Sequence, residues 1–338
     1  MPAGSRPLRR RSEPLWRTKV AFSAKTVHIR GVRVHTGTSG FSYDEWHGRF
    51  YPAKLPAEDR LRHYSSRLLS VEINNTFYQM PKVALLEGWR DAVTDNFRFA
   101  LKVPRRITHS QQLRESKDSL DYFLTAASAL GEKLGPVLFQ LPPFLRKDAP
   151  RLADFLALLP PTLLAAFEFR HPSWFDDEVF GLLADRNAAL CGGDAEKGER
   201  SPPHVATASF GYLRLRAPSY DEGGLRSWSS RILAEGWTDA YVYLKHEVLG
   251  PDYAAFLAAV ATGTPEPLWV SLVAPPAAPA EPQARPKKGL VRAVPQAVPE
   301  PAALAAKPAR AIKGLARTSS SKAATETAKT RSGAKARR

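Results

Sequence analysis

Eight short apolar runs alternate with amphipathic stretches through the middle of the chain, and this alternation constrains the fold more than any other feature. The runs are Val32–Gly37, Leu69–Asn74, Phe97–Val103, Pro136–Leu141, Ala165–Arg170, Ala188–Cys191, Tyr212–Arg216 and Tyr241–His246. Helix-like stretches separate them, among them Ala57–Arg67, Lys82–Val93, Ser119–Glu132, Ala149–Leu159, Asp176–Arg186 and Asp252–Thr262. Strands that alternate with helices are typical of a parallel sheet. Eight such units in about 240 residues predict a single-domain α/β fold, the (β/α)8 TIM barrel.

A doubly wound open sheet is the alternative arrangement of the same elements. That fold often carries a Gly-rich phosphate loop after its first strand. Here the first run leads into Thr36–Phe41, which contains Gly37 and Gly40 but lacks the GxGxxG spacing. The barrel is therefore the favoured prediction.

Polar side chains recur at alternate positions of the apolar runs. Side chains alternate between the two faces of a strand, so Val71 and Ile73 share one face while Glu72 and Asn74 share the other. In a barrel one face meets the helices and the other points inward, and the apolar set suits the helix layer. The predicted inward polar set is Glu72, Asn74, Lys102, Gln140, Glu168, Arg170, Arg214, Arg216 and Lys245. These residues gather toward the C-terminal ends of their strands, where barrel enzymes carry their chemistry.

The charges of this end of the barrel predict what it binds. Its negative charges come from Glu72, Glu168 and Asp194, and its positive charges from Lys102, Arg170, Arg214, Arg216 and Lys245. A net positive mouth favours anionic ligands such as phosphate, carboxylate or a nucleic-acid backbone. The alternative is a set of mutual salt bridges that only fill the mouth.

Three of these residues are candidates for catalysis. Glu168 stands between two phenylalanines, where desolvation is expected to raise its pKa and suit it to acid or base work; the alternative is an ion pair with an arginine. Glu72 is the second carboxylate, three strands away across the mouth. Such a pair suits glycoside hydrolysis, although strands two and five are not the usual positions in retaining barrels. Lys102 is a candidate for Schiff-base chemistry, or else it neutralises Glu72 or binds a substrate anion.

The loops that follow the strands supply further candidates. His109 and His171 are predicted to donate hydrogen bonds at the rim. A divalent metal held by them with Glu168 and Asp194 is the less favoured alternative, because no HxH or HExxH spacing supports it. Aromatic residues of these loops are expected to stack on a sugar or base, or else to pack within the loops; they are Trp46, Phe77, Tyr78 and Trp174. Cys191 is expected to be a buried, inert thiol.

The charge of the chain is unevenly distributed. The formal net charge is +16, but residues 1–33 carry +8, residues 275–338 carry +11, and the body between them, residues 34–274, carries −3. Both ends are predicted to be disordered basic tails, because they offer little apolar surface to bury. Weak, salt-sensitive attraction to nucleic acid is one expectation for them, and simple solubilisation is the other. A single cysteine and the lack of a long apolar run predict a cytoplasmic protein with no membrane association.

Several motifs in the body resemble those of a known family. They are Gly37–Phe41 (GTSGF), Trp46–Pro52 (WHGRFYP), Val71–Tyr78 (VEINNTFY), Lys102–Pro104 with Ile107–His109, Leu138–Pro143 (LFQLPP) and Glu168–Trp174 (EFRHPSW). Together they resemble the YecE-like family of uncharacterised proteins, and the resemblance implies a TIM barrel without a settled activity. Near the end the pattern departs, because Arg216 and Ala217 stand where the family tends to have His and Gly. Lys245 and His246 replace its usual Asn pair.

The favoured functional hypothesis is an enzyme, hydrolase- or isomerase-like, that acts on a phosphorylated sugar, nucleotide or carboxylate. Its catalytic residues would be Glu168, Glu72 and Lys102. Its substrate contacts would come from Asn74, His109, Gln140, Arg170, His171, Arg214, Arg216, Lys245, Trp46 and Tyr78. No cofactor is predicted. The alternatives are a nucleic-acid-associated protein that its tails direct to the polymer, and a barrel that binds a metabolite without turning it over.

Overall fold

The computed structural model describes residues 31–196 and 201–273, and within these ranges eight parallel strands close into a barrel in sequence order. The strands are β1 (Arg33–Ser39), β2 (Ser70–Ile73), β3 (Arg98–Lys102), β4 (Leu134–Gln140), β5 (Ala165–Glu168), β6 (Ala189–Gly193), β7 (Phe210–Leu215) and β8 (Asp239–Leu244). The last strand closes the ring by pairing in parallel with the first. The predicted TIM barrel is therefore confirmed, and the open sheet is excluded.

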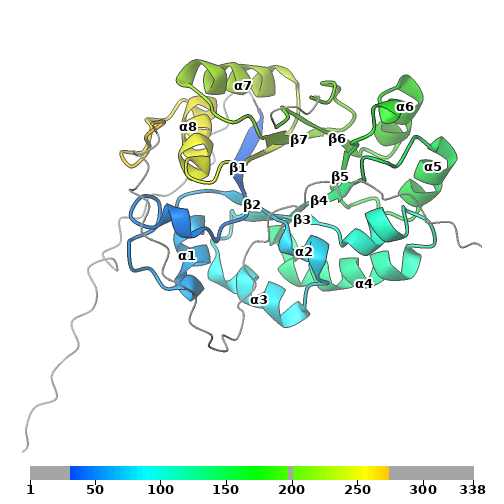
Figure 1. Ribbon diagram of the computed structural model, residues 1–338, viewed down its shortest axis with the longest axis horizontal. Helices are drawn as coiled ribbons and strands as arrows, with labels where there is room; N and C mark the ends of the chain where they lie inside the picture. Colours follow the sequence, from blue (N-terminus) through cyan, green and yellow to red (C-terminus); the bar gives the residue numbers. More distant parts are fainter. Residues whose placement is uncertain (1–30, 197–200, 274–338) are drawn as a thin grey trace, which may run out of the picture. The chain divides into compact units, whose positions relative to one another are not determined.

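Helices lie outside the ring of strands (Figure 1). They are α1 (Arg60–Ser65), α2 (Asn75–Tyr78), α3 (Val83–Ala92), α4 (Lys117–Ala127), α5 (Ala149–Ala157), α6 (Asp177–Asp185), α7 (Glu222–Ala234) and α8 (Gly250–Thr262). Five shorter helical turns within the described residues are Asp44–Trp46, Ala57–Asp59, Arg106–Ser110, Ser128–Lys133 and Pro172–Trp174. Two of the eight, α2 and α7, did not stand out in the sequence: α2 has only four residues, and α7 has two glycines in its first turn and is rich in serine.

The two faces of the barrel wall carry different side chains, as the period of two predicts. Val71, Phe99 and Val242 join the apolar core between strands and helices. On the inner face Tyr212 and Tyr243 pack with their ring centroids 5.3 Å apart, in a second cluster that combines aromatic side chains with alanines. The predicted inward orientation is confirmed for the polar residues that lie within strands and share this inner face, namely Glu72, Lys102, Gln140, Glu168 and Arg214.

The predicted basic tails fall largely on residues 1–30 and 274–338, which lie outside the described residues. The structure describes the last residues of the first predicted tail, and Arg33 already belongs to β1, where its guanidinium pairs with Asp239 at 2.6 Å. No helix in the described part of the chain is both long and apolar enough to cross a membrane.

Candidate functional site

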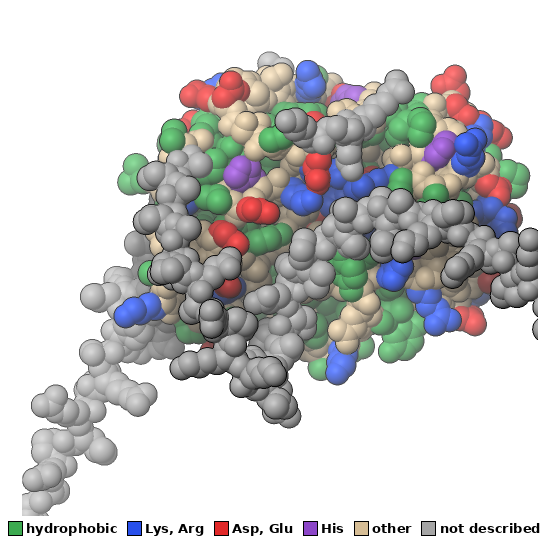
Figure 2. All heavy atoms as spheres, viewed as in Figure 1, with side chains coloured by type: hydrophobic (Ala, Val, Ile, Leu, Met, Phe, Trp, Pro, Cys, Tyr) green, Lys and Arg blue, Asp and Glu red, His purple; other side chains and the backbone are tan. Residues whose placement is uncertain are grey.

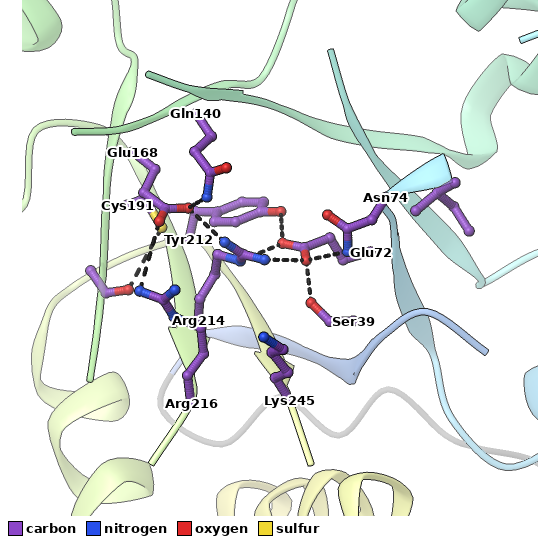
Figure 3. A network of polar contacts seen from close by, with 12 residues as sticks. Ser39, Glu72, Asn74, Gln140, Glu168, Cys191, Tyr212, Arg214, Arg216 and Lys245 are labelled. Atoms are coloured by element: carbon purple, nitrogen blue, oxygen red, sulfur yellow. Dashed lines mark hydrogen bonds and ion pairs between the residues drawn. The ribbon is translucent and has the colours of Figure 1, made fainter. Parts of the chain in front are cut away.

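A buried ion-pair network joins opposite sides of the barrel at the C-terminal ends of the strands. Arg214 of β7 places Nη1 at 2.7 Å from Oε2 of Glu168 on β5. Its Nη2 and Nε lie 3.0 Å from the two carboxylate oxygens of Glu72 on β2. Figure 3 shows the guanidinium of Arg214 between the two carboxylates. All three side chains are buried, so the space across which these carboxylates face each other is filled by a cation.

Both carboxylate oxygens of Glu72 accept hydrogen bonds from neighbouring side chains. The hydroxyl of Ser39 donates to it, Nδ2 of Asn74 donates at 3.0 Å, and the hydroxyl of Tyr212 donates at 2.8 Å. Burial alone would raise the pKa of Glu72, but the charge of Arg214 and these three donors hold the pKa below its ordinary value. A fully enclosed carboxylate with every oxygen engaged has the character of a structural anchor.

Glu168 is surrounded by cations. Arg170 donates from Nε to Oε1 at 3.1 Å, Nη2 of Arg216 lies 3.7 Å from the same oxygen, and Gln140 donates to Oε2 at 2.9 Å. Burial would raise the pKa of Glu168, yet the charges of Arg214, Arg170, Arg216 and Lys102 together lower it far below its ordinary value. The expectation of a raised pKa is therefore wrong, because four cations converge on a carboxylate that the sequence places only between phenylalanines. Glu168 is ionised at neutral pH.

The lowered pKa values of Glu72 and Glu168 predict an acid-labile fold. An unfolded glutamate titrates near pH 4.3, so below that pH the unfolded chain binds more protons than the folded one. The stabilisation is complete above about pH 5 and is lost as pH falls from there toward the folded-state pKa values. In urea denaturation of the wild type, the free energy of unfolding should stay constant from pH 7 to about pH 5 and then fall steeply toward pH 3. In Glu168→Gln the fall should be shallower; an equal slope in both proteins contradicts this assignment.

Lys102 and two rim residues meet around one aromatic ring. Lys102, at the end of β3, places Nζ 4.2 Å from the centre of the Phe77 ring in α2. His109 and Tyr78 both approach the edge or face of the same ring, with centroids 4.9 and 5.1 Å away. Tyr78 is 48% exposed. The predicted group of Lys102, His109 and Tyr78 is thus brought together on the β2–β3 side of the mouth.

A second acid meets the cations at the ends of β7 and β8. Lys245 donates from Nζ to Oε1 of Glu196 at 2.6 Å, and Nη1 of Arg216 lies 4.0 Å from the same oxygen. Asp194 has a different role, since it accepts the backbone N–H groups of Arg216 and Ala217 and so ties the end of β6 to that of β7. Sequence reasoning did not find Glu196, because the charged stretch after β6 gives no sign of which acid turns back to the barrel.

Some predicted site residues serve the fold. Trp46 is fully buried, and its indole donates to the backbone oxygen of Glu247 at 2.7 Å. Trp174 is fully buried too, and its indole N–H donates a hydrogen bond to the backbone oxygen of Leu145. The expectation that Trp46 stacks on a ligand is therefore wrong: it forms part of the core. His171 caps the short turn Pro172–Trp174, where its Nδ1 accepts from the backbone N–H of Ser173.

No three His, Cys, Asp or Glu side chains within residues 31–196 and 201–273 are grouped so that they could hold a metal ion. Nδ1 of His109 lies 2.9 Å from the hydroxyl of Thr108.

Cys191 lies inside the barrel, and burial raises the pKa of its thiol well above the ordinary value. The thiol is therefore protonated at neutral pH.

Comparison with known proteins places the chain in a family. A family model described as "Protein of unknown function DUF72" matches residues 35–278, more than half of the chain. The UPF0759 protein YecE of Escherichia coli K12 is 38% identical over 116 residues, which are 34% of this chain and 43% of YecE. The matched segment thus spans less than half the length of this curated relative.

Solved structures share the fold. A DUF72 family protein of Thermotoga maritima superposes with a TM-score of 0.57 at 23% identity, and the match covers 68% of this chain and 97% of that one. A DUF72 family protein of Enterococcus faecalis gives a TM-score of 0.56 at 18% identity over 68% of this chain and 94% of its own. With the family match and the closed barrel, the chain belongs to the DUF72 family of YecE-like proteins, as the motifs implied.

Proposed function

We propose that the C-terminal mouth of this barrel binds a small anionic substrate, with ionised Glu168 as the acid/base group beside it. The observation that carries the proposal is the convergence of cations from three strands on that carboxylate. In the described part of the chain the mouth contains Lys102, Arg170, Arg214, Arg216 and Lys245, against Glu72, Glu168, Asp194 and Glu196. Figure 2 shows Lys and Arg side chains beside acidic ones near the middle of the face drawn.

The guanidinium groups at the mouth are well shielded from water. Arg214 lies between Glu72 and Glu168 and contacts both. Arg170 and Arg216 add two further guanidinium groups around Glu168. Guanidinium groups bind phosphate and carboxylate with two parallel hydrogen bonds. In this proposal a phosphate or carboxylate binds between Arg170 and Arg216, in exchange for contacts that these arginines already make.

The same arrangement gives Glu168 a way to become a useful base. While arginines surround it, its pKa is low and it has little tendency to accept a proton. An anion that recruits Arg170 and Arg216 takes part of their positive charge away from Glu168. The pKa of Glu168 then rises toward the range in which a carboxylate accepts protons from substrate. In this proposal the substrate itself activates the base.

Inorganic phosphate should stabilise the full-length protein through this site. At a hundredfold excess over Kd a ligand that binds only the folded state adds about 2.7 kcal/mol of stability. The melting temperature of the wild type should therefore rise with phosphate more than with sodium chloride of equal ionic strength. In Arg216→Ala the rise should be largely lost, and Arg170→Gln should weaken it independently.

Both variants keep the basic ends of the chain, so any anion binding there is the same in all three proteins. If phosphate raises the melting temperature equally in the wild type and both variants, phosphate does not bind at the mouth. A shift confined to the wild type supports it.

A further inference from the structure

One carboxylate at the mouth is held differently from the others. The side chain of Glu196 is 43% exposed, and so is that of its partner Lys245. The carboxylates of Glu72 and Glu168 are 0% and 7% exposed, by contrast, and pair with a buried guanidinium. Ion pairs open to solvent contribute about 0–1 kcal/mol, so the contact between Glu196 and Lys245 is easily exchanged for another.

Glu196 also stands where cations from separate strands converge. Oε1 of Glu196 accepts from Lys245, which follows β8, and lies 4.0 Å from Nη1 of Arg216, which follows β7. Burial would raise the pKa of Glu196, but the hydrogen bond from Lys245 and the charges of Lys245, Arg216 and Arg170 lower it. The carboxylate therefore interacts electrostatically with cations that follow three different strands.

Arg216 links this carboxylate to the candidate base. Nη2 of Arg216 lies 3.7 Å from Glu168, while its Nη1 faces Glu196. The backbone N–H of Arg216 donates to Asp194, two residues before Glu196, and this contact holds the start of the segment against β7. Glu196 is thus presented to the arginine that the proposed substrate would use.

We propose that Glu196 occupies the oxyanion subsite of the mouth, formed by Arg216 and Lys245, and competes with the carboxylate or phosphate group of the ligand. This inference rests on the proposed function and names the place where the ligand's anionic group binds. Because Lys245 and Arg216 both approach one oxygen of Glu196, the same two groups suit an oxygen of a ligand's carboxylate or phosphate. Ligand affinity is then set by the fraction of molecules in which Glu196 has left the subsite.

Titration calorimetry with inorganic phosphate, and in a parallel arm with succinate, tests this inference on the full-length protein at fixed ionic strength. If Glu196 fills the subsite in about nine molecules of ten, Glu196→Gln should lower Kd about tenfold. Glu222→Gln is the matched control, because it removes the same charge from an exposed ion pair on α7. Its Kd should stay within about twofold of the wild type.

The variant Glu196→Asp distinguishes occupation of the subsite by the side chain of Glu196 from simple electrostatic repulsion of the ligand. This variant keeps the charge but withdraws it by one methylene group, so occupation predicts tighter binding and pure repulsion predicts wild-type affinity. Tighter binding of succinate than of phosphate in Glu196→Gln would assign the subsite to a carboxylate, and the reverse order to a phosphate.

The outcomes separate the two proposals. Equal affinities in the wild type, Glu196→Gln and Glu196→Asp would overturn the competition while leaving the anion site standing. Binding of neither anion by any variant would overturn the proposed function itself. Binding only after Glu196→Gln would support both, with the subsite fully occupied in the wild type.

Discussion

Replacing Arg214 with methionine should lower the free energy of unfolding by about 3–5 kcal/mol at pH 7, the range found when one partner of a buried ion pair is removed. The guanidinium lies between Glu72 and Glu168 and donates hydrogen bonds to both carboxylates. Without it, two enclosed negative charges lose their shared counter-charge. For a domain of this size the melting temperature should fall on the order of 10 °C.

The pH dependence of the Arg214→Met defect identifies its cause. Once the cation is absent, burial raises the pKa of Glu72, whose counter-charge is lost, while Arg170, Arg216 and Lys102 still lower that of Glu168. Glu72 can then take up a proton as pH falls toward 5, which relieves the buried charge. The stability difference from the wild type should therefore shrink between pH 7 and pH 5. A constant difference over this range would indicate lost packing instead.

Lys117→Ala provides the matched control. Lys117 pairs with Asp121 one helical turn along α4, and both side chains are more than half exposed. An exposed pair of this kind contributes about 0.3–0.5 kcal/mol. In denaturant titrations, the loss in free energy of unfolding should be several-fold larger for Arg214→Met than for Lys117→Ala. A loss below about 1 kcal/mol in Arg214→Met would contradict the buried network.

Both carboxylates are expected to stabilise the fold, and Glu72→Gln should destabilise it by about 3 kcal/mol. An amide cannot accept all the donors that converge on Glu72 from Ser39, Asn74, Tyr212 and Arg214, and it leaves the arginine half-compensated. Glu168→Gln should cost a similar amount, because it leaves Arg214 half-compensated and removes the carboxylate that Arg170 and Arg216 contact. Urea denaturation of the two variants gives this comparison directly.

Ligand binding should distinguish the roles of the two carboxylates. Glu168→Gln removes a negative charge next to the proposed anion, so phosphate should bind this variant at least as tightly as the wild type, while any turnover is lost. Glu72→Gln should leave affinity nearly unchanged at a temperature where it is folded. Phosphate affinity that changes equally in the two variants would contradict the separation into an anchor and a base.

The sequence was sufficient for the barrel and for the direction of its polar side chains. Period-two alternation around Glu72 and Arg214 places both inside, because one face of each strand is apolar enough to need the helix layer. It could not show that one guanidinium joins β2 to β5, since that contact depends on how strands far apart in the sequence face each other across the ring. The pKa of Glu168 was misjudged for the same reason, because its cations come from β3 and β7 as well as from its own strand.

Loop residues were less predictable than strand residues. Trp46 follows β1 and was expected at the rim, but the turn Asp44–Trp46 folds inward and packs the indole against Phe50 and Tyr64. Nothing in the local pattern distinguishes an indole that packs from one that stacks on a ligand. Glu196 was missed because its importance comes from Lys245 and Arg216, which are distant in the sequence.

The most direct test of the anion site is a crystal structure of the protein grown with inorganic phosphate. Our proposal predicts phosphate density at the mouth within hydrogen-bond distance of Arg216 and beside Glu168, with the ion pair between Arg214 and Glu72 intact. Phosphate found only elsewhere on the protein, with Arg170 and Arg216 unchanged around Glu168, would contradict it and leave the charged mouth as a structural network.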